Sequence, residues 1–219
     1  MAPSMEIDAD AETVLRRKAK AVLRKRARAL RNTIPEAAIK ERSEKIVAAL
    51  LTLPEVANAK AVALFYPIEG RNEVDLRPLD GELRSRGARV AYPTIDPETR
   101  VMSFRFVADT EAMDEKGFGF REPGADAEDA GALDVVVVPA LQIDGNGHRI
   151  GYGAGYYDRT IPRYCPPAMA VGVAFDFQLV AEVPVTEGDV AVSMVVTDQR
   201  VFRAGESRDE GPGEQKRRR

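Results

Sequence analysis

DGNGHRIGYGAGYYDR, residues 144–159, is the stretch around which the chain is organised. An apolar run, VVVV at 135–138, precedes it and is bounded by Asp134 and Pro139, which predicts a buried strand. Five glycines lie within the stretch, and a helix is expected to begin near Gly155. A strand, a glycine-rich loop and a helix start together favour an anion site, because loop amides can converge on a negative charge that the helix dipole stabilises.

The same glycines could instead form only a hairpin. The dipeptides DG and NG at 144–147 are turn signals, and they predict a turn between residues 141–143 and 148–150. The alternating run GYGAG at 151–155 is more than a turn needs, because each glycine costs backbone entropy unless a close approach requires it. Its spacing matches neither the dinucleotide fingerprint nor a Walker A loop, so glycine content alone favours neither a ligand loop nor a hairpin.

Residues 149–159, RIGYGAGYYDR, resemble the signature R-x-G-x-G-x-G-[YF]-Y-D-R of the 5-formyltetrahydrofolate cyclo-ligase family, also called 5,10-methenyltetrahydrofolate synthetases. Pro139, Asp144 and Gly147 supply the P…D-x-x-G lead-in of that signature. The resemblance covers most of the chain. It implies ATP-dependent cyclisation of 5-formyltetrahydrofolate to 5,10-methenyltetrahydrofolate, in which ATP phosphorylates the formyl oxygen and ADP and phosphate are released. It also implies Mg²⁺ as the cofactor.

A basic helix is expected near the N-terminus, and most of its cations are interpreted as a solvated face. Lys20 and Arg24 differ, because their i, i+4 spacing lets both bind one polyanion. They also match a K-x-x-x-R pair that reaches the nucleotide phosphates in the family, with Lys18 and Arg28 as near alternatives.

The resemblance implies further site residues, with Arg149 and Tyr156 acting in catalysis. The expected ATP-binding residues are Lys20, Arg24, Arg149, Gly151, Tyr152, Gly153, Ala154, Gly155, Tyr156 and Tyr157. The expected folate-binding residues are Tyr66, Glu73, Phe120, Tyr152, Gly153, Ala154, Gly155 and Tyr156.

Three of these assignments need comment. Glu73 matches a glutamate that contacts the pterin in the family, but the loop is longer here and Glu69 is an alternative. Phe120 lies in a segment similar to G-[IF]-x-E-P. Its ring would either form one side of the pterin pocket or pack in a surface turn. Tyr152 and Ala154 stand where some family members carry Arg and Lys. ATP is therefore expected either to bind more weakly or to have its phosphates neutralised by other cations of the protein.

Asp158 and Asp189 are the expected Mg²⁺ ligands. Asp158 follows the glycine loop, and Asp189 matches an E-x-D segment of the family. Mg²⁺ needs few protein oxygens, because phosphates and waters supply the rest. Either aspartate could instead be a helix cap or turn residue.

Composition excludes several classes of protein. A net charge of −3 does not favour a nucleic-acid binder, and no apolar stretch is long enough to span a membrane. The acidic N-terminus is unlike a signal peptide. One cysteine, Cys165, excludes an internal disulfide and fits a reducing compartment, so we expect a cytoplasmic protein. We also expect a monomer. A non-catalytic folate- or nucleotide-binding regulatory protein is the alternative function, and an RNA-associated protein is a third.

Alternating helices and strands with short connections predict a single three-layer α/β domain over residues 11–203, with a mostly parallel sheet flanked by helices. Residues 1–10 are interpreted as a flexible leader and 204–219 as a disordered charged tail. Helices are expected at 11–31, 35–53, 75–87 and 155–163. Strands are expected at 60–66, 89–93, 101–107, 135–138, 169–175 and 193–197.

Overall fold

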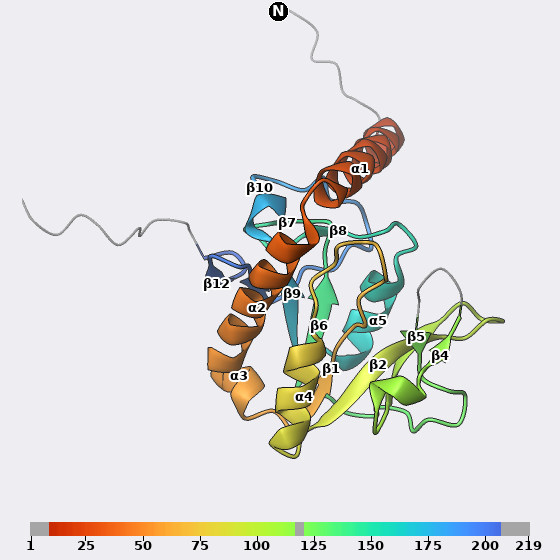
Figure 1. Cartoon of the computed structure of the whole chain (residues 1–219). Coiled ribbons are helices and arrows are strands. Elements are labelled where there is room, and N and C mark those ends of the chain that lie inside the picture. The colour runs from red at the N-terminus through yellow and green to blue at the C-terminus, as the bar shows by residue number, and fades with distance from the viewer. Residues whose placement is uncertain (1–8, 117–120, 207–219) are drawn as a thin grey trace, which may run out of the picture.

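A seven-stranded sheet forms the centre of the computed structural model, which describes residues 9–116 and 121–206 (Figure 1). The strand order is β12-β11-β9-β6-β1-β2-β3. The five inner strands run parallel, and β3 and β12 pair antiparallel at the two edges. The strands are β1 (Ala61–Ala63), β2 (Arg89–Ile95), β3 (Met102–Phe106), β6 (Val135–Pro139), β9 (Met169–Val173), β11 (Met194–Val196) and β12 (Val201–Arg203).

Helices cover both faces of this sheet, which confirms the predicted three-layer α/β fold (Figure 1). The helices are α1 (Ala9–Asn32), α2 (Glu36–Thr52), α3 (Pro54–Ala57), α4 (Arg77–Ser85) and α5 (Tyr156–Tyr164). Alternate residues of β6 face opposite sides: Val135 and Val137 pack with α2 and α4, whereas Val136 and Val138 pack with α5. A strand buried on both faces has no polar alternation, and this explains the continuous valine run.

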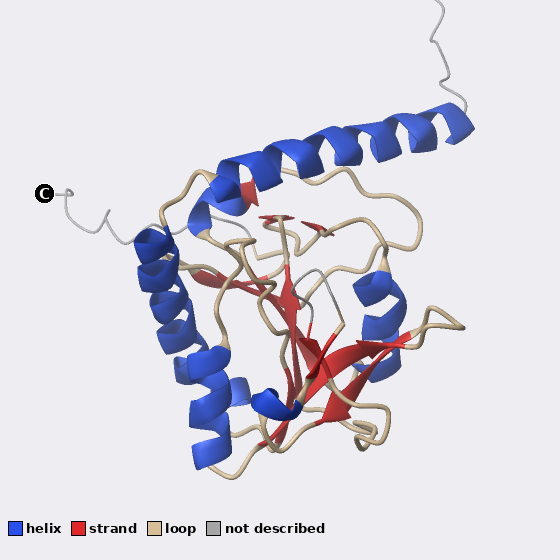
Figure 2. Cartoon of the chain, turned by 45° about the vertical axis from the view of Figure 1, so that its right-hand side comes forward, coloured by secondary structure: helices blue, strands red, loops and turns tan. Residues whose placement is uncertain are grey.

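α1 lies across the end of the sheet, and Arg16 in its first half still donates to the Val185 carbonyl at 2.7 Å (Figure 2). It begins at Ala9, inside the stretch interpreted as a leader. Its C-terminal half packs Leu23 and Ala27 against a small three-stranded sheet, so one face of the basic helix is fixed to the body. That sheet consists of β7 (Gln142–Asp144), β8 (Arg149–Ile150) and β10 (Leu179–Val180).

The predicted turn within 144–147 connects β7 to β8. Asp144 is 1% exposed, and its carboxylate accepts backbone N–H groups of Asn146 at 2.9 Å, His148 at 3.0 Å and Val183 at 2.9 Å. Gly147 has φ +79°, a backbone conformation that residues with a side chain rarely adopt. The turn therefore fixes the direction in which β8 enters the glycine loop.

The remaining elements are short. β1 ends at Ala63, three residues before the predicted end, although Leu64 still donates a hydrogen bond to Ala91. β12 and the two-stranded sheet of β4 (Asp114–Glu115) and β5 (Arg121–Glu122) were not predicted. Two 3-10 helices complete the described chain, η1 (Thr110–Ala112) and η2 (Asp176–Gln178). Within the described residues, no helix combines the length and apolarity that crossing a membrane requires.

Candidate functional site

A cavity of about 600 Å³ opens at the carboxyl ends of β1 and β6, where open α/β sheets bind ligands. Its lining includes α1, the loop after β1, the glycine loop and residues 186–189, together with residues of β2, β3 and β5. The cavity brings together every described residue that the sequence assigned to the site. These are Lys20, Arg24, Tyr66, Glu73, Arg149, Gly151, Tyr152, Gly153, Ala154, Gly155, Tyr156, Tyr157, Asp158 and Asp189. Phe120 lies outside the described residues.

The glycine loop packs directly against α1. Arg24 donates from Nε to the Gly151 carbonyl at 2.9 Å. Gly153 has φ +106°, and a Cβ built on it would lie 2.9 Å from Cζ of Arg24. Burial, with the neighbouring charge of Arg28, lowers the pKa of Arg24 from its usual value. Gly153 is therefore required twice, for its backbone conformation and for the space that the Arg24 guanidinium occupies.

The resemblance implies that this loop binds ATP. Gly153→Ala should then raise the KM for ATP by about tenfold, because the strained φ and the displaced Arg24 together cost about 1–3 kcal/mol. Steady-state kinetics with ATP varied would measure this. Gly151→Ala is the matched comparison, since its added Cβ meets no atom within 4 Å. Equal effects of the two substitutions would show that contact with Arg24 is not what Gly153 provides.

Arg149 and Asp158 form a pair at the start of α5. Arg149 is 9% exposed and donates from Nη2 to Asp158 Oδ1 at 2.9 Å and from Nη1 to the Val190 carbonyl. The Val190 amide donates to the same Asp158 oxygen at 3.2 Å. Burial lowers the pKa of Arg149, while the Asp158 carboxylate opposes that shift. A desolvated guanidinium beside a helix N-terminus favours an anionic ligand.

Lys20 and Asp189 contact each other across the cavity wall. Lys20 Nζ is paired with Asp189 Oδ2 and also donates to Thr186 Oγ1 at 3.0 Å. The Thr186 amide donates to Asp189 Oδ2 at 2.6 Å. Burial opposes ionisation of Asp189, but the hydrogen bonds from Lys20 and Thr186 outweigh it and lower its pKa. A predicted phosphate-binding cation and a predicted metal ligand thus pair with each other.

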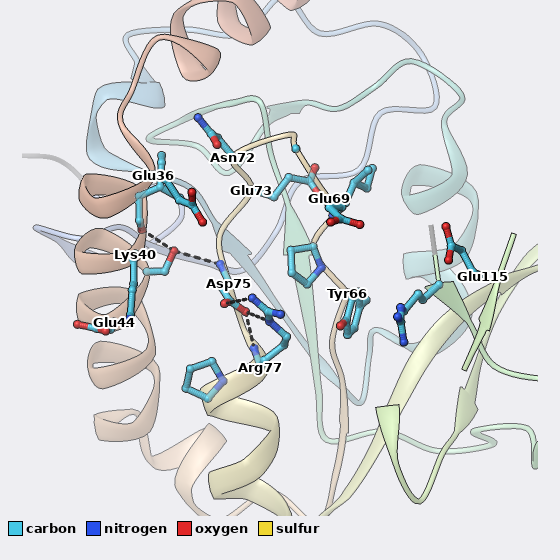
Figure 3. Close-up of a pocket in the computed structure, with 17 residues that line it drawn as sticks. Glu36, Lys40, Glu44, Tyr66, Glu69, Asn72, Glu73, Asp75, Arg77 and Glu115 are labelled. Atoms are coloured by element: carbon cyan, nitrogen blue, oxygen red, sulfur yellow. Dashed lines mark hydrogen bonds and ion pairs between the residues drawn. The ribbon is translucent and has the colours of Figure 1, made fainter. Parts of the chain in front are cut away.

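A second cavity of about 800 Å³ lies along the loop after β1 (Figure 3). Tyr66 and Glu73 line both cavities, whereas Glu69 is exposed and lines only the second. Glu73 is 7% exposed and accepts hydrogen bonds from the Ile68 amide at 2.9 Å and from Tyr152 Oη at 2.6 Å. Of the two alternatives in the sequence, Glu73 is the one that lines the cavity with the glycine loop.

Arg31 is a site residue that the sequence reasoning missed. The sequence placed it with the solvated cations of α1, but it is 3% exposed and lines the cavity. Its position supplied a usable signal, because Lys20, Arg24 and Arg31 follow one another at four and seven residues along one helical face. Lys18 and Arg28, the alternatives to the predicted pair, do not line the cavity.

Comparison with known proteins gives consistent results. The family model described as the 5-formyltetrahydrofolate cyclo-ligase family matches residues 16–198. A protein of Escherichia coli (strain K12) named 5-formyltetrahydrofolate cyclo-ligase is 32% identical over 187 residues, which are 83% of this chain and 99% of that protein.

Solved structures show the same architecture. The NMR structure of a 5,10-methenyltetrahydrofolate synthetase from Aquifex aeolicus superposes with a TM-score of 0.74 at 32% identity, over 88% of this chain and 96% of the other. A synthetase structure from Mycoplasma pneumoniae shares the fold with a TM-score of 0.65 at 22% identity, over 82% of this chain and 98% of the other.

Proposed function

The chain belongs to the 5-formyltetrahydrofolate cyclo-ligase family, and from that premise we propose how its own residues carry out the reaction. The enzyme is an ATP-dependent ligase that converts 5-formyltetrahydrofolate to 5,10-methenyltetrahydrofolate. The observation that carries the assignment of roles is that Lys20, Arg24 and Arg149 line one cavity together with the glycine-rich loop.

The chemical difficulty is a poor leaving group, because the formyl oxygen must depart as N10 closes the ring. In the proposed route the formyl oxygen attacks the γ-phosphorus of ATP, and the bond to ADP breaks. The N10 lone pair then attacks the formyl carbon, the carbon–oxygen bond to phosphate breaks, and N10 gives up its proton. Such transfers depend mainly on positioning and on neutralising charge, and they need no protein nucleophile.

We assign the neutralising roles to cations on two elements. Lys20 and Arg24 come from α1, and Arg149 comes from β8 directly before the loop. On phosphate binding, Lys20 would exchange its contact with Asp189 for a phosphate oxygen. Tyr156 lines the cavity in the first turn of α5, beside the expected position of the transferred group.

The folate would bind at the side of the cavity formed by the loop after β1. Glu73 offers a carboxylate to pterin N–H groups, and Tyr66 offers an aromatic ring. Glu73 and Tyr152 already share a hydrogen bond, so the two expected folate contacts are held together.

Mg²⁺ fits the acidic residues present. The described residues contain no group of three or more His, Cys, Asp or Glu side chains placed to hold a metal by themselves. Asp158 and Asp189 both line the cavity, and two carboxylates suffice for Mg²⁺ when phosphates and waters complete its shell. When bound, the ion would neutralise charge on the phosphate oxygens. Asp158 would hold it through Oδ2, because Oδ1 already accepts from Arg149 and Val190.

Asp158→Asn should lower kcat by about tenfold, because the amide keeps the shape of the aspartate but removes its charge. Capping is not at issue, since Gly155 is the N-cap of α5 and Asp158 lies inside the helix. Raising the Mg²⁺ concentration should recover part of the loss. The thermal midpoint should fall, because the buried Arg149 guanidinium loses its ion-pair partner, so kinetics should be measured well below it. Wild-type turnover of the Asn variant at limiting Mg²⁺ would remove Asp158 from the metal site.

The proposed function is tested by the absorbance of the methenyl product. Purified protein, 5-formyltetrahydrofolate, ATP and Mg²⁺ should give a rising signal, and omission of ATP should abolish it. A protein that binds both substrates without any ATP-dependent signal would be the non-catalytic alternative. The cytoplasmic location and the monomeric state also remain proposals, which cell fractionation and light scattering would test.

A further inference from the structure

Three segments distant in sequence meet at Arg31, in the last turn of α1. Its Nη2 donates to Tyr152 Oη in the glycine loop at 2.6 Å. Its Nη1 lies 3.7 Å from Oε1 of Glu73, in the loop after β1. Tyr152 donates to that same glutamate oxygen at 2.6 Å, so one hydroxyl bridges the arginine and the carboxylate. The three side chains form a closed network on the cavity wall.

The backbone around Arg31 is fastened to the same loop. The Asn72 side-chain amide donates to the Arg31 carbonyl at 3.1 Å and to the Ile34 carbonyl at 3.0 Å. Asn72 adopts φ +50°, an uncommon conformation that asparagine tolerates better than most residues. It stands beside Glu73 on the loop (Figure 3). The end of α1 and the Glu73 loop are thus held in one fixed relation.

The network is costly as a stability device. The side chains of Arg31 and Glu73 are 4% and 5% exposed, so both charges are desolvated. Nε of Arg31 is buried and has no hydrogen-bond partner among the described residues. Buried ion pairs contribute little net stability, and an unsatisfied buried donor lowers it further, so a role in function accounts for the network better.

Tyr152 is suited to connect the two charges. Tyr152 as a whole is 38% exposed, but its hydroxyl lies between Arg31 and Glu73. Desolvation at that point and the Glu73 carboxylate raise the pKa of the hydroxyl to about 12, so it remains a hydrogen-bond donor at neutral pH. The Arg31 guanidinium carbon lies 5.8 Å from the centre of the Tyr152 ring, which adds a cation–π contact. The hydroxyl can therefore accept from Arg31 and donate to Glu73 at the same time.

We propose that Arg31 is a positioning residue for the folate substrate, which aims the Glu73 carboxylate into the cavity by way of Tyr152. This inference rests on the proposed function, in which Glu73 contacts the folate. The glycine loop has a separate attachment to α1 through Arg24 and Gly151. Loss of Arg31 should therefore disturb the folate side of the cavity and leave the ATP side nearly intact.

The test compares steady-state kinetics of Arg31→Met, Arg31→Lys and Tyr152→Phe with those of wild type, varying each substrate in turn. Arg31→Met should raise the KM for 5-formyltetrahydrofolate by about 10- to 100-fold, because small misplacements of a binding group carry such costs, and should change the KM for ATP about twofold at most. Arg31→Lys should be intermediate, since lysine keeps the charge but lacks the fork that reaches both partners. Arg26→Met is the control, because Arg26 is exposed on the same helix.

Tyr152→Phe keeps the ring and removes only the bridging hydroxyl, so it decides the matter if Arg31→Met fails to fold. Tyr152→Phe should also raise the KM for 5-formyltetrahydrofolate. The double variant, Arg31→Met with Tyr152→Phe, should have a folate KM no higher than that of Arg31→Met alone. A lower thermal midpoint with both KM values unchanged, or equal increases in both, would overturn the positioning role.

Glu73→Gln separates this inference from the function it rests on. If Glu73→Gln raises the folate KM and the Arg31 and Tyr152 variants do not, the positioning role is wrong and the folate contact stands. If Glu73→Gln also leaves the folate KM unchanged, the assigned folate contact itself is wrong, and the inference falls with it.

Discussion

Arg149→Met is expected to lower kcat/KM for ATP by about 100-fold. Arg149 is buried beside the glycine loop and paired with Asp158, where the phosphates are expected. Methionine has a similar length but no charge, so it removes a charge-assisted contact of about 1.5–3 kcal/mol, and each 1.36 kcal/mol is tenfold in rate. It also leaves Asp158 without its cation, which adds an unbalanced negative charge near the phosphates.

Stability has to be separated from catalysis in this experiment. Breaking the pair with Asp158 is expected to lower the thermal midpoint, so kinetics should be measured well below it. Arg149→Lys keeps a charge in the same place and should recover part of the loss. Arg163→Met, an exposed arginine on α5, is the matched control. Wild-type kcat/KM in folded Arg149→Met would exclude Arg149 from the phosphate site.

Lys20→Met should raise the KM for ATP by about 10- to 100-fold and leave the KM for the folate nearly unchanged. The ammonium group lies at the cavity wall, held by Asp189 and Thr186, and it is free to exchange these for a phosphate. Loss of one charge-assisted contact costs about 1.5–3 kcal/mol. Because Lys20 is already neutralised by Asp189, part of its affinity for phosphate goes into breaking that pair.

The control for Lys20 lies on the same helix. Lys18 is exposed and does not line the cavity, so Lys18→Met should have little effect. An unchanged KM for ATP in Lys20→Met, together with a raised KM in Lys18→Met or Arg28→Met, would show that the register of the predicted pair is wrong. Equal, small effects of all three substitutions would indicate only a general contribution of positive charge.

The layered fold was predictable because its signals are local. The valine run of β6 sends alternate residues to two apolar clusters, and only a strand covered on both faces needs such continuity. The glycine run was equally readable. Gly153 and Gly155 both adopt positive φ. Because few other residues tolerate that conformation, glycines in the sequence indicate where the loop backbone adopts it.

The edges of the fold were less predictable. β12 has three residues and lies at the sheet edge, with Val201 and Arg203 exposed. A strand that short carries almost no periodicity, so only its pairing with β11 defines it. The order of the inner strands also follows from packing between elements, which no local pattern encodes.

The residues of the site were predictable as types and positions, but their partners were not. A helical repeat places Lys20, Arg24 and Arg31 on one face, yet it does not say what covers that face. The glycine loop and the loop after β1 cover it, so Arg31 is buried against Tyr152 and Glu73, whereas Lys25 and Arg26 of the same helix are exposed. The sequence by itself determined the layered fold, the glycine loop and the charged groups around it. Only the tertiary structure decided which of those charges are buried, because burial depends on contacts between segments far apart in the chain.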